Sequence, residues 1–259
     1  MKSFKNILIP IDFSGSAQNA VQYALTIFKN HSVEIDFIYV NSTDKNLENK
    51  EIQKKFEEFD NKHLKHVPFI YRFTLVEGEL IPELTNAVSK FGSDLMIMCT
   101  MGREDPSELS NTSSMICQVD CPVIVVPQKY TNHQIKNIGY ANDYKEIKAA
   151  SVLEPIWDFA LNFKAKVFLF HIVPDKKAMP VPVTTVEDTL DYYLESLEHE
   201  YMYVSNEDVD HAINECIREK KIDLLVVLSR AHGKNKLDSE GKLITHLSRH
   251  SSIPILTLC

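Results

Sequence analysis

Two aspartates, Asp12 and Asp143, each follow a short and largely apolar run of residues. Such a run predicts a buried strand of a parallel sheet. Each aspartate then lies at the carboxyl end of its strand, where open α/β sheets usually hold their ligands. A carboxylate in that place could bind a ligand directly, or it could accept hydrogen bonds from the first N–H groups of the following helix. The sequence leaves both interpretations open.

Histidines and cysteines, the usual soft metal ligands, form no recognisable site. Cys117 and Cys121 are four residues apart but no histidines cluster with them, and His246 and His250 have neither an HExxH motif nor a third ligand nearby. The five cysteines include no C-x-x-C pair, which favours reduced thiols that pack as small apolar groups. His171, inside an apolar run, is expected to be a buried histidine. We therefore predict no metal centre.

The charge balance excludes some classes of partner. The net charge of −8 is spread evenly over the two halves of the chain, so no basic stripe is present that could bind a nucleic-acid backbone. No apolar run is long enough to cross a bilayer, and the first residues become charged too soon for a signal peptide. We expect a cytoplasmic protein that binds neither nucleic acid nor membrane.

Strands and helices must alternate to position the two aspartates. Apolar runs predict strands over 6–11, 33–40, 66–76, 94–99 and 121–127, and helical spacing predicts helices over 17–28, 45–64, 81–91 and 107–118. Ser14 or Ser16 can cap the first of these helices. Such alternation is typical of parallel strands with right-handed crossovers, and it predicts a doubly wound α/β domain with helices on both faces of the sheet.

The second half of the chain repeats the first. The segment KNIGYANDY (136–144) corresponds to KNILIPIDF (5–13), and DLLVVL (223–228) corresponds to DLMIMC (94–99), at offsets of 131 and 129 residues. A near-constant offset indicates a duplication. We predict two tandem domains, 1–129 and 130–259, each with a five-stranded parallel sheet, joined by a polar linker. In the second, 174–188 should form a loop before a helix over 191–203, whose tyrosines and acids could contribute a partner surface.

These segments resemble the universal stress protein family. The resemblance rests on ILIPIDFSGSAQNAVQYA, DLMIMCTMG, SNTSSMI and CPVIVVP in the first repeat and on HLSRHSSIPIL in the second. It implies the adenine nucleotide alpha hydrolase-like, Rossmann-like fold. It also implies that two domains pair through their last strands, here within one chain, and that a homodimer and other protein partners are possible.

Nucleotide-binding members of this family carry an acid after the first strand, which Asp12 and Asp143 match. The resemblance further implies that Val40 and Ile172, near the ends of the second strands, would offer backbone groups to an adenine. If these positions bind no nucleotide, Val40 and Ile172 are ordinary core residues.

The family's phosphate loop, G-x2-G-x9-G-[ST], follows the fourth strand. Its glycines let the backbone approach the phosphates. The first repeat keeps Gly102 and aligns Ser110 with the hydroxyl position, but its loop is short, poor in glycine and acidic. The second repeat keeps the nine-residue spacing between Ala231 and Gly241, with Lys242 next, and its loop is basic, which suits an anion better.

We therefore predict a non-catalytic stress-response or signalling module with pseudo-symmetric paired domains. The alternative is a sensor that binds an adenine nucleotide (ATP or AMP, with Mg²⁺), mainly through the second repeat. A slow ATPase is the third hypothesis, for which the sequence offers no identifiable catalytic base and metal-ligand set.

Overall fold

The computed structural model describes residues 4–42, 47–100, 111–142, 150–173, 190–229, 247 and 251–258. The elements of the first half, in chain order, are β1 (Asn6–Pro10), α1 (Gly15–Ile27), β2 (Glu34–Asn41), α2 (Asn49–Phe59), a π-helical turn (Asp60–Leu64), β3 (Ile70–Glu77), α3 (Leu80–Phe91), β4 (Leu95–Thr100), α4 (Asn111–Ile116) and β5 (Val123–Pro127). Those of the second half are β6 (Asn137–Asn142), a 3-10 turn (Ala150–Leu153), α5 (Glu154–Phe163), β7 (Lys166–Val173), β8 (His199–Ser205), α7 (Val209–Lys220), β9 (Leu224–Leu228) and β10 (Ile255–Leu258).

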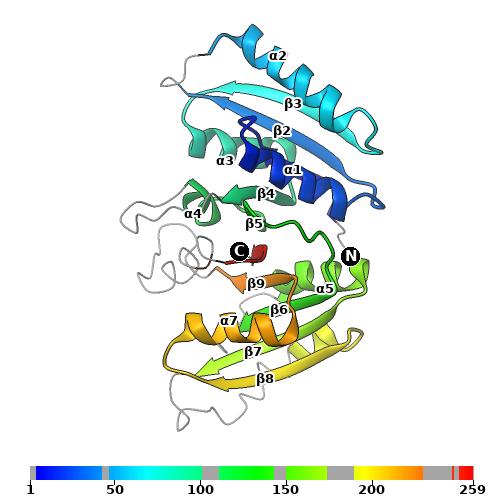
Figure 1. The fold of residues 1–259 in the computed structure, drawn as a ribbon, viewed down its shortest axis with the longest axis vertical. Helices are drawn as coiled ribbons and strands as arrows, with labels where there is room; N and C mark the ends of the chain where they lie inside the picture. The colour runs from blue at the N-terminus through cyan, green and yellow to red at the C-terminus, as the bar shows by residue number, and fades with distance from the viewer. Residues whose placement is uncertain are drawn as a thin grey trace.

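A single ten-stranded sheet runs through both halves, in the order β3-β2-β1-β4-β5-β10-β9-β6-β7-β8 (Figure 1). Every described neighbour pair is parallel except β5 and β10, which pair antiparallel. Each half therefore has five parallel strands. The second half has the same strand order as the first, read in the opposite direction across the sheet. The predicted α/β fold class is confirmed.

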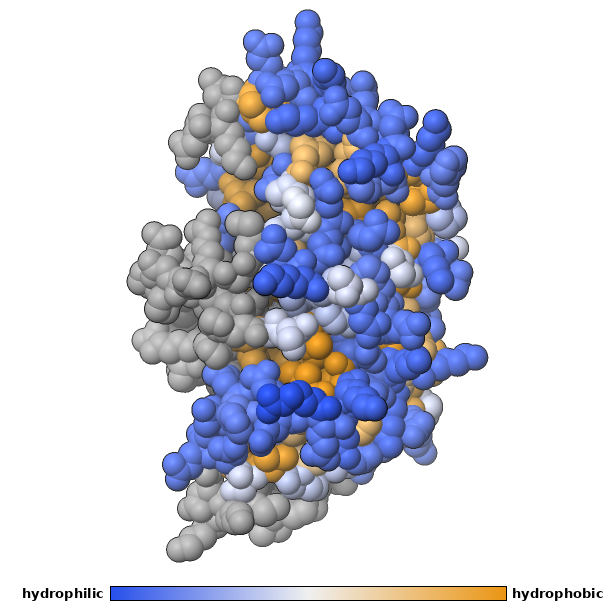
Figure 2. All heavy atoms as spheres, in the orientation of Figure 1, coloured by the Kyte–Doolittle hydropathy of each residue, from blue (hydrophilic) through white to orange (hydrophobic). Residues whose placement is uncertain are grey.

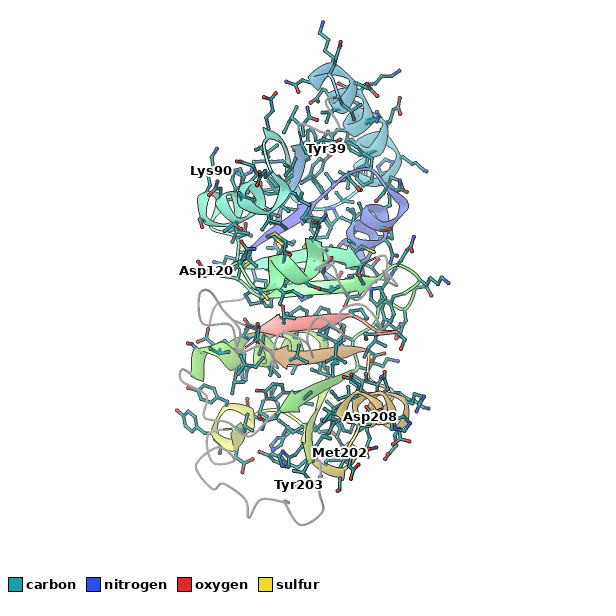
Figure 3. The ribbon with its side chains drawn as sticks, turned by 90° about the vertical axis from the view of Figure 1, so that its left-hand side faces the viewer. Tyr39, Lys90, Asp120, Met202, Tyr203 and Asp208 are labelled. Atoms are coloured by element: carbon teal, nitrogen blue, oxygen red, sulfur yellow. The ribbon has the colours of Figure 1, made fainter. Side chains whose placement is uncertain are left out.

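Helices cover both faces of this sheet (Figure 3). In the first half the chain steps outward from β1 to β3 and then returns to β4, so right-handed crossovers put α3 on the face opposite α1 and α2. Strands β1, β4 and β5 are buried almost throughout, which explains why their sequences are nearly continuous apolar runs.

One carboxylate contact is repeated at the start of each half. Asp94 accepts hydrogen bonds from the backbone N–H groups of residues 5 and 6, at 3.0 to 3.3 Å, and Asp223 accepts them from residues 136 and 137, at 2.9 and 3.0 Å. The carboxylate thereby holds the beginning of the first strand of its half next to the beginning of the fourth. This shared contact gives a structural reason for the aspartates that recur at an offset of 129 residues.

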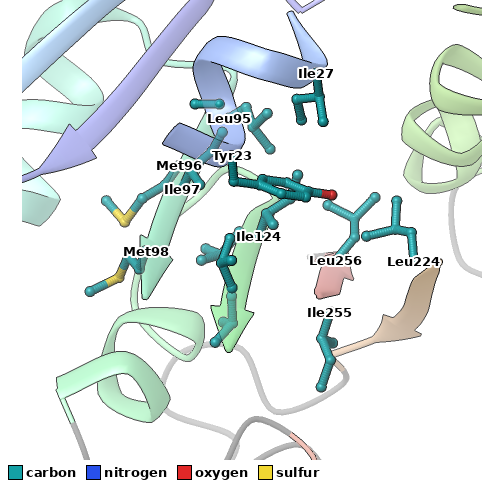
Figure 4. Close-up of a cluster of buried hydrophobic side chains, with 14 of the residues drawn as sticks. Tyr23, Ile27, Leu95, Met96, Ile97, Met98, Ile124, Leu224, Ile255 and Leu256 are labelled. Carbon is teal, nitrogen blue, oxygen red and sulfur yellow. The ribbon is translucent and has the colours of Figure 1, made fainter. Parts of the chain in front are cut away.

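The two halves meet at the seam between β5 and β10. Leu256 lies opposite Ile124, both fully buried, and the Thr257 hydroxyl donates to the carbonyl oxygen of Val123 at 3.2 Å. Tyr23 of α1 lies against the side chains of this seam (Figure 4). Burial raises the pKa of the Tyr23 hydroxyl well above its ordinary value. The seam is an apolar core that belongs to both halves.

A second contact between the halves lies where α1 ends. The rings of Phe28 and Phe159 are 6.4 Å apart between centroids, and those of His31 and Phe163 are 5.5 Å apart. Asp158 is buried in the same region, and burial raises its pKa to about 6. Helix packing therefore joins the halves in addition to the strand seam.

The predicted helix over residues 191–203 is wrong in its second part. Residues 190–194 are helical, but β8 (His199–Ser205) is a strand that pairs in parallel with β7 at the edge of the sheet. Pairing with β7 decides the local structure of this segment, as tertiary context often does for strands. The predicted loop over 174–188 lies outside the described residues.

Polar residues predominate on the face of the molecule seen in Figure 2. Among the described residues, no helix is long and apolar enough to cross a membrane.

Candidate functional site

The first candidate residue, Asp12, lies in the turn between β1 and α1. Its Oδ1 atom accepts a hydrogen bond from the backbone N–H of Ser14 at 3.0 Å. Ser14 is the N-cap of α1, and its hydroxyl accepts from the N–H of Ala17 at 3.2 Å. The sequence left two interpretations of Asp12 open, ligand binding and a hydrogen bond at the start of the helix. The structure shows the hydrogen bond. Asp12 is nevertheless an exposed residue.

Phe13, between these two residues, has a left-handed backbone conformation with φ +62°. A bulky side chain rarely adopts this conformation, which costs of the order of 1–3 kcal/mol. Its ring stacks on Tyr39 at a centroid distance of 5.5 Å and also packs near Phe59 and Phe73. The aromatic cluster offsets the strain, and it fixes the turn that carries Asp12.

A cleft of about 440 Å³ lies between this turn and α2. Two acids, two lysines and a histidine are among its lining residues. Burial lowers the pKa of His63, so its ring is neutral at pH 7. Charges of both signs therefore balance, and the cleft has no strong preference for an anion. The lining residues are Asp12, Phe13, Ser14, Gln18, Lys55, Glu58, Phe59, Lys62 and His63.

Sequence reasoning missed the contribution of α2 to this cleft. The sequence predicted a helix over 45–64 but gave it no place at the site, whereas Ile52, Phe56 and Phe59 are buried in the structure. Their spacing of three and four residues was the available signal. That spacing places Lys55 and the following π-helical turn beside the end of β1. π-Helical turns are frequent at functional sites.

Cys99, in β4, lies close to the same turn. Burial raises the pKa of its thiol to about 11, although a hydrogen bond with the side chain of Ser16 opposes the shift. A thiol with this pKa is protonated at neutral pH and is a poor nucleophile. The described cysteines Cys99, Cys117, Cys121 and Cys216 form no disulfide with one another.

Two other candidate residues are described. Val40 lies in β2 two residues beyond Ile38, the partner of Pro10 in β1, so the structure brings it to the same sheet edge as Asp12. Ile172 lies near the end of β7, and both side chains pack against the core. Whether their backbone groups contact a ligand stays a prediction. The candidates outside the described residues are Gly102, Ser110, Asp143, Ala231, Gly241 and Lys242.

Metal ligands do not gather in the part of the chain that the structure describes: no group of three or more histidine, cysteine, aspartate or glutamate side chains could hold an ion there. His171 is buried in β7, as expected, and its ring packs edge-on against Tyr203 at 6.0 Å. His246 and His250 lie outside the described residues.

The sequence and fold can now be compared with known proteins. Residues 3–127 match the model of the universal stress protein family. The first half of the chain belongs to that family. No curated protein sequence matches the chain. A universal stress protein from Archaeoglobus fulgidus superposes on 98% of this chain and 95% of its own, with a TM-score of 0.74 and 17% identity.

Two other solved structures share this two-half arrangement. A putative universal stress protein from Pseudomonas aeruginosa has a TM-score of 0.64 and 13% identity, covering 98% of this chain and 93% of its own. The cytoplasmic domain of a prokaryotic cation chloride cotransporter has a TM-score of 0.56 and 10% identity, covering 98% and 95%. At these identities the likeness shows the fold, which includes both halves.

Proposed function

We propose that this universal stress protein is a non-catalytic module of a stress response or a signalling pathway, which acts by binding other molecules. Its joined halves form a scaffold, and each half has a sheet edge at the carboxyl ends of its strands. Protein partners or a second copy of the chain would bind to the surfaces of this scaffold. The observation that carries this proposal is that the carboxylate of Asp12 takes part in the turn that precedes α1. One carboxylate oxygen accepts the N–H of Ser14, and the strained, aromatic-packed Phe13 fixes the turn.

Three further features support a structural role for the turn in the first half. The cleft beside Asp12 has charges of both signs, which gives little attraction for a phosphate group. The thiol of Cys99 is protonated at neutral pH, so it is no candidate nucleophile. The sequence of the following loop adds the three acids of REDPSE, which would repel a triphosphate.

The second candidate function is binding of an adenine nucleotide by the second half. The specific observation that favours it is the sequence between Ala231 and Gly241, which keeps the family's nine-residue spacing. The stretch contributes several basic residues, which would attract the phosphates. Asp143 would be the acid that contacts the base, and Mg²⁺ would accompany the phosphates.

Calorimetric titration of ATP, ADP and AMP, with and without Mg²⁺, distinguishes the two candidates. The Asp12→Ala variant should bind as the wild-type chain does, because Asp12 serves the turn. A scaffold without a nucleotide site gives no heat at millimolar ligand. A nucleotide sensor gives binding that is lost in Asp143→Ala and in Gly241→Trp, which obstructs the second loop. Binding that is lost in Asp12→Ala and kept in Asp143→Ala would contradict both candidates.

A further inference from the structure

A second cleft of about 440 Å³ opens at the carboxyl edge of the first half, where β2 and β3 end and α2 begins. It shares no lining residue with the cleft beside Asp12. Oxygen-bearing side chains predominate among the residues that line it: Asn41, Ser42, Glu48, Asn49 and Glu77. Lys50 is the one cation among its described lining residues.

Asn41, the last residue of β2, has a buried amide oxygen that no described residue pairs with. Asn41 is only 8% exposed, and its Nδ2 atom donates a hydrogen bond to the carbonyl oxygen of Leu47 at 2.9 Å. Its Oδ1 atom accepts no hydrogen bond from the residues that the structure describes. A buried acceptor left unpaired costs about 1–3 kcal/mol. A bound water or cation in the cleft would satisfy it.

The strand register places a carboxylate beside this oxygen. Asn41 and Glu77 are partners on the parallel strands β2 and β3, so their side chains lie on the same face of the sheet. Glu77 accepts a long hydrogen bond, with 3.5 Å between Nδ2 of Asn49 and Oε1 of Glu77. Within the described ranges, no lysine or arginine forms an ion pair with Glu77.

Glu48 brings a second carboxylate from the α2 side of the cleft. It occupies the N-cap position of α2, but its side chain makes no capping hydrogen bond. It also forms no ion pair with any described residue. The carboxylates of Glu48 and Glu77 are therefore both available to the cleft, next to the unpartnered oxygen of Asn41.

We propose that this cleft binds a hydrated divalent cation through Glu48, Glu77 and the amide oxygen of Asn41. Carboxylate and amide oxygens are the ligands that Mg²⁺ and Ca²⁺ prefer, and Mg²⁺ commonly keeps several waters while one or two carboxylates hold it. The volume of the cleft leaves room for those waters. The ion links the ends of β2 and β3 to the start of α2.

Lys50 gives the site a built-in competitor. Its ammonium group lines the same cleft, so its positive charge opposes the entry of a cation. Removing Lys50 should therefore strengthen binding, whereas removing either glutamate should weaken it. Opposite effects of neighbouring substitutions distinguish a defined site from general attraction of cations to an acidic protein.

Titration of the full chain with Mn²⁺, in the absence of nucleotide, tests the proposal. The free ion is measured by electron paramagnetic resonance, and Mg²⁺ and Ca²⁺ are added as competitors. We expect a dissociation constant on the order of 0.1–1 mM, which is typical of weak oxygen-ligand sites. Glu77→Gln should weaken binding about tenfold, and Lys50→Ala should tighten it about threefold, because each changes one unit charge near the ion.

The matched control is Glu34→Gln, an exposed carboxylate at the opposite end of β2. This variant should bind Mn²⁺ as the wild type does. Since Asn41→Leu alters a buried residue, its fold is checked by circular dichroism before its lost affinity is interpreted, and the exposed Glu77 variant carries the test independently. Equal affinities of the wild-type, Glu77→Gln and Glu48→Gln chains would overturn the proposal. An equal loss in Glu34→Gln would overturn it as well.

Discussion

Truncation of Leu256 to alanine is expected to destabilise both halves of the protein together, by about 3 kcal/mol. Leu256 is fully buried in β10 and lies opposite Ile124 of β5. Loss of a buried leucine costs about 2–5 kcal/mol, because apolar contacts are lost and a cavity remains. Since this core belongs to both halves, its loss should lower the stability of both, and they should still unfold together as one unit.

Two optical probes check this expectation during urea unfolding. Trp157 is the single tryptophan and lies in α5, so its fluorescence reports on the second half, whereas circular dichroism reports on both. The two transitions should coincide in the wild type and in Leu256→Ala. The control is Leu161→Ala on the same helix, because Leu161 is 41% exposed and its loss should cost less than about 1 kcal/mol. A shift of the fluorescence transition alone would contradict a shared core.

Replacement of Arg72 by methionine is expected to cost about 3 kcal/mol. Asp36 of β2 is buried, with 1% of its side chain exposed, and Arg72 of β3 holds it with two hydrogen bonds of 2.7 and 3.0 Å. Removing one partner of a buried pair leaves an uncompensated charge, which costs about 3–5 kcal/mol. We expect the lower end of this range, because the Arg72 side chain is 54% exposed and water can reach the site.

A second substitution separates the buried charge from simple loss of packing. The double variant Asp36→Val, Arg72→Met should recover most of the stability, since it removes the charge together with its partner. Lys54→Met is the matched control, because the pair of Lys54 and Glu58 is exposed on α2 with a separation of 3.9 Å. Exposed pairs contribute about 0–1 kcal/mol. If Arg72→Met cost no more than Lys54→Met in urea unfolding, the ion pair would have no structural importance.

Much of the fold could be predicted from the sequence, because its signals are local and repeated. Apolar runs predicted the strands near the sheet centre. The near-constant offset between corresponding segments of the two halves, such as those that begin at Asp94 and Asp223, predicted the duplication. Residues 191–203 could not be assigned correctly, because the pairing of β8 with β7 is a long-range contact that the local composition does not report.

The candidate site was predicted in part. The position of Asp12 after β1 follows from the apolar run before it, but its hydrogen bond to Ser14 depends on the left-handed conformation of Phe13. That conformation is stabilised by aromatic residues from β2, β3 and α2, which are distant in sequence. The cleft at Asn41 could not be predicted either, because it depends on the register of Asn41 with Glu77.

The central claim is the proposal that this protein binds other molecules and does not turn over a substrate. The most direct test is continuous measurement of the phosphate released from millimolar ATP by the purified full chain with Mg²⁺, beside a protein-free control. We expect no release above that control over several hours. Steady release over many turnovers that Asp143→Ala abolishes would contradict the claim and would identify an ATPase in the second half.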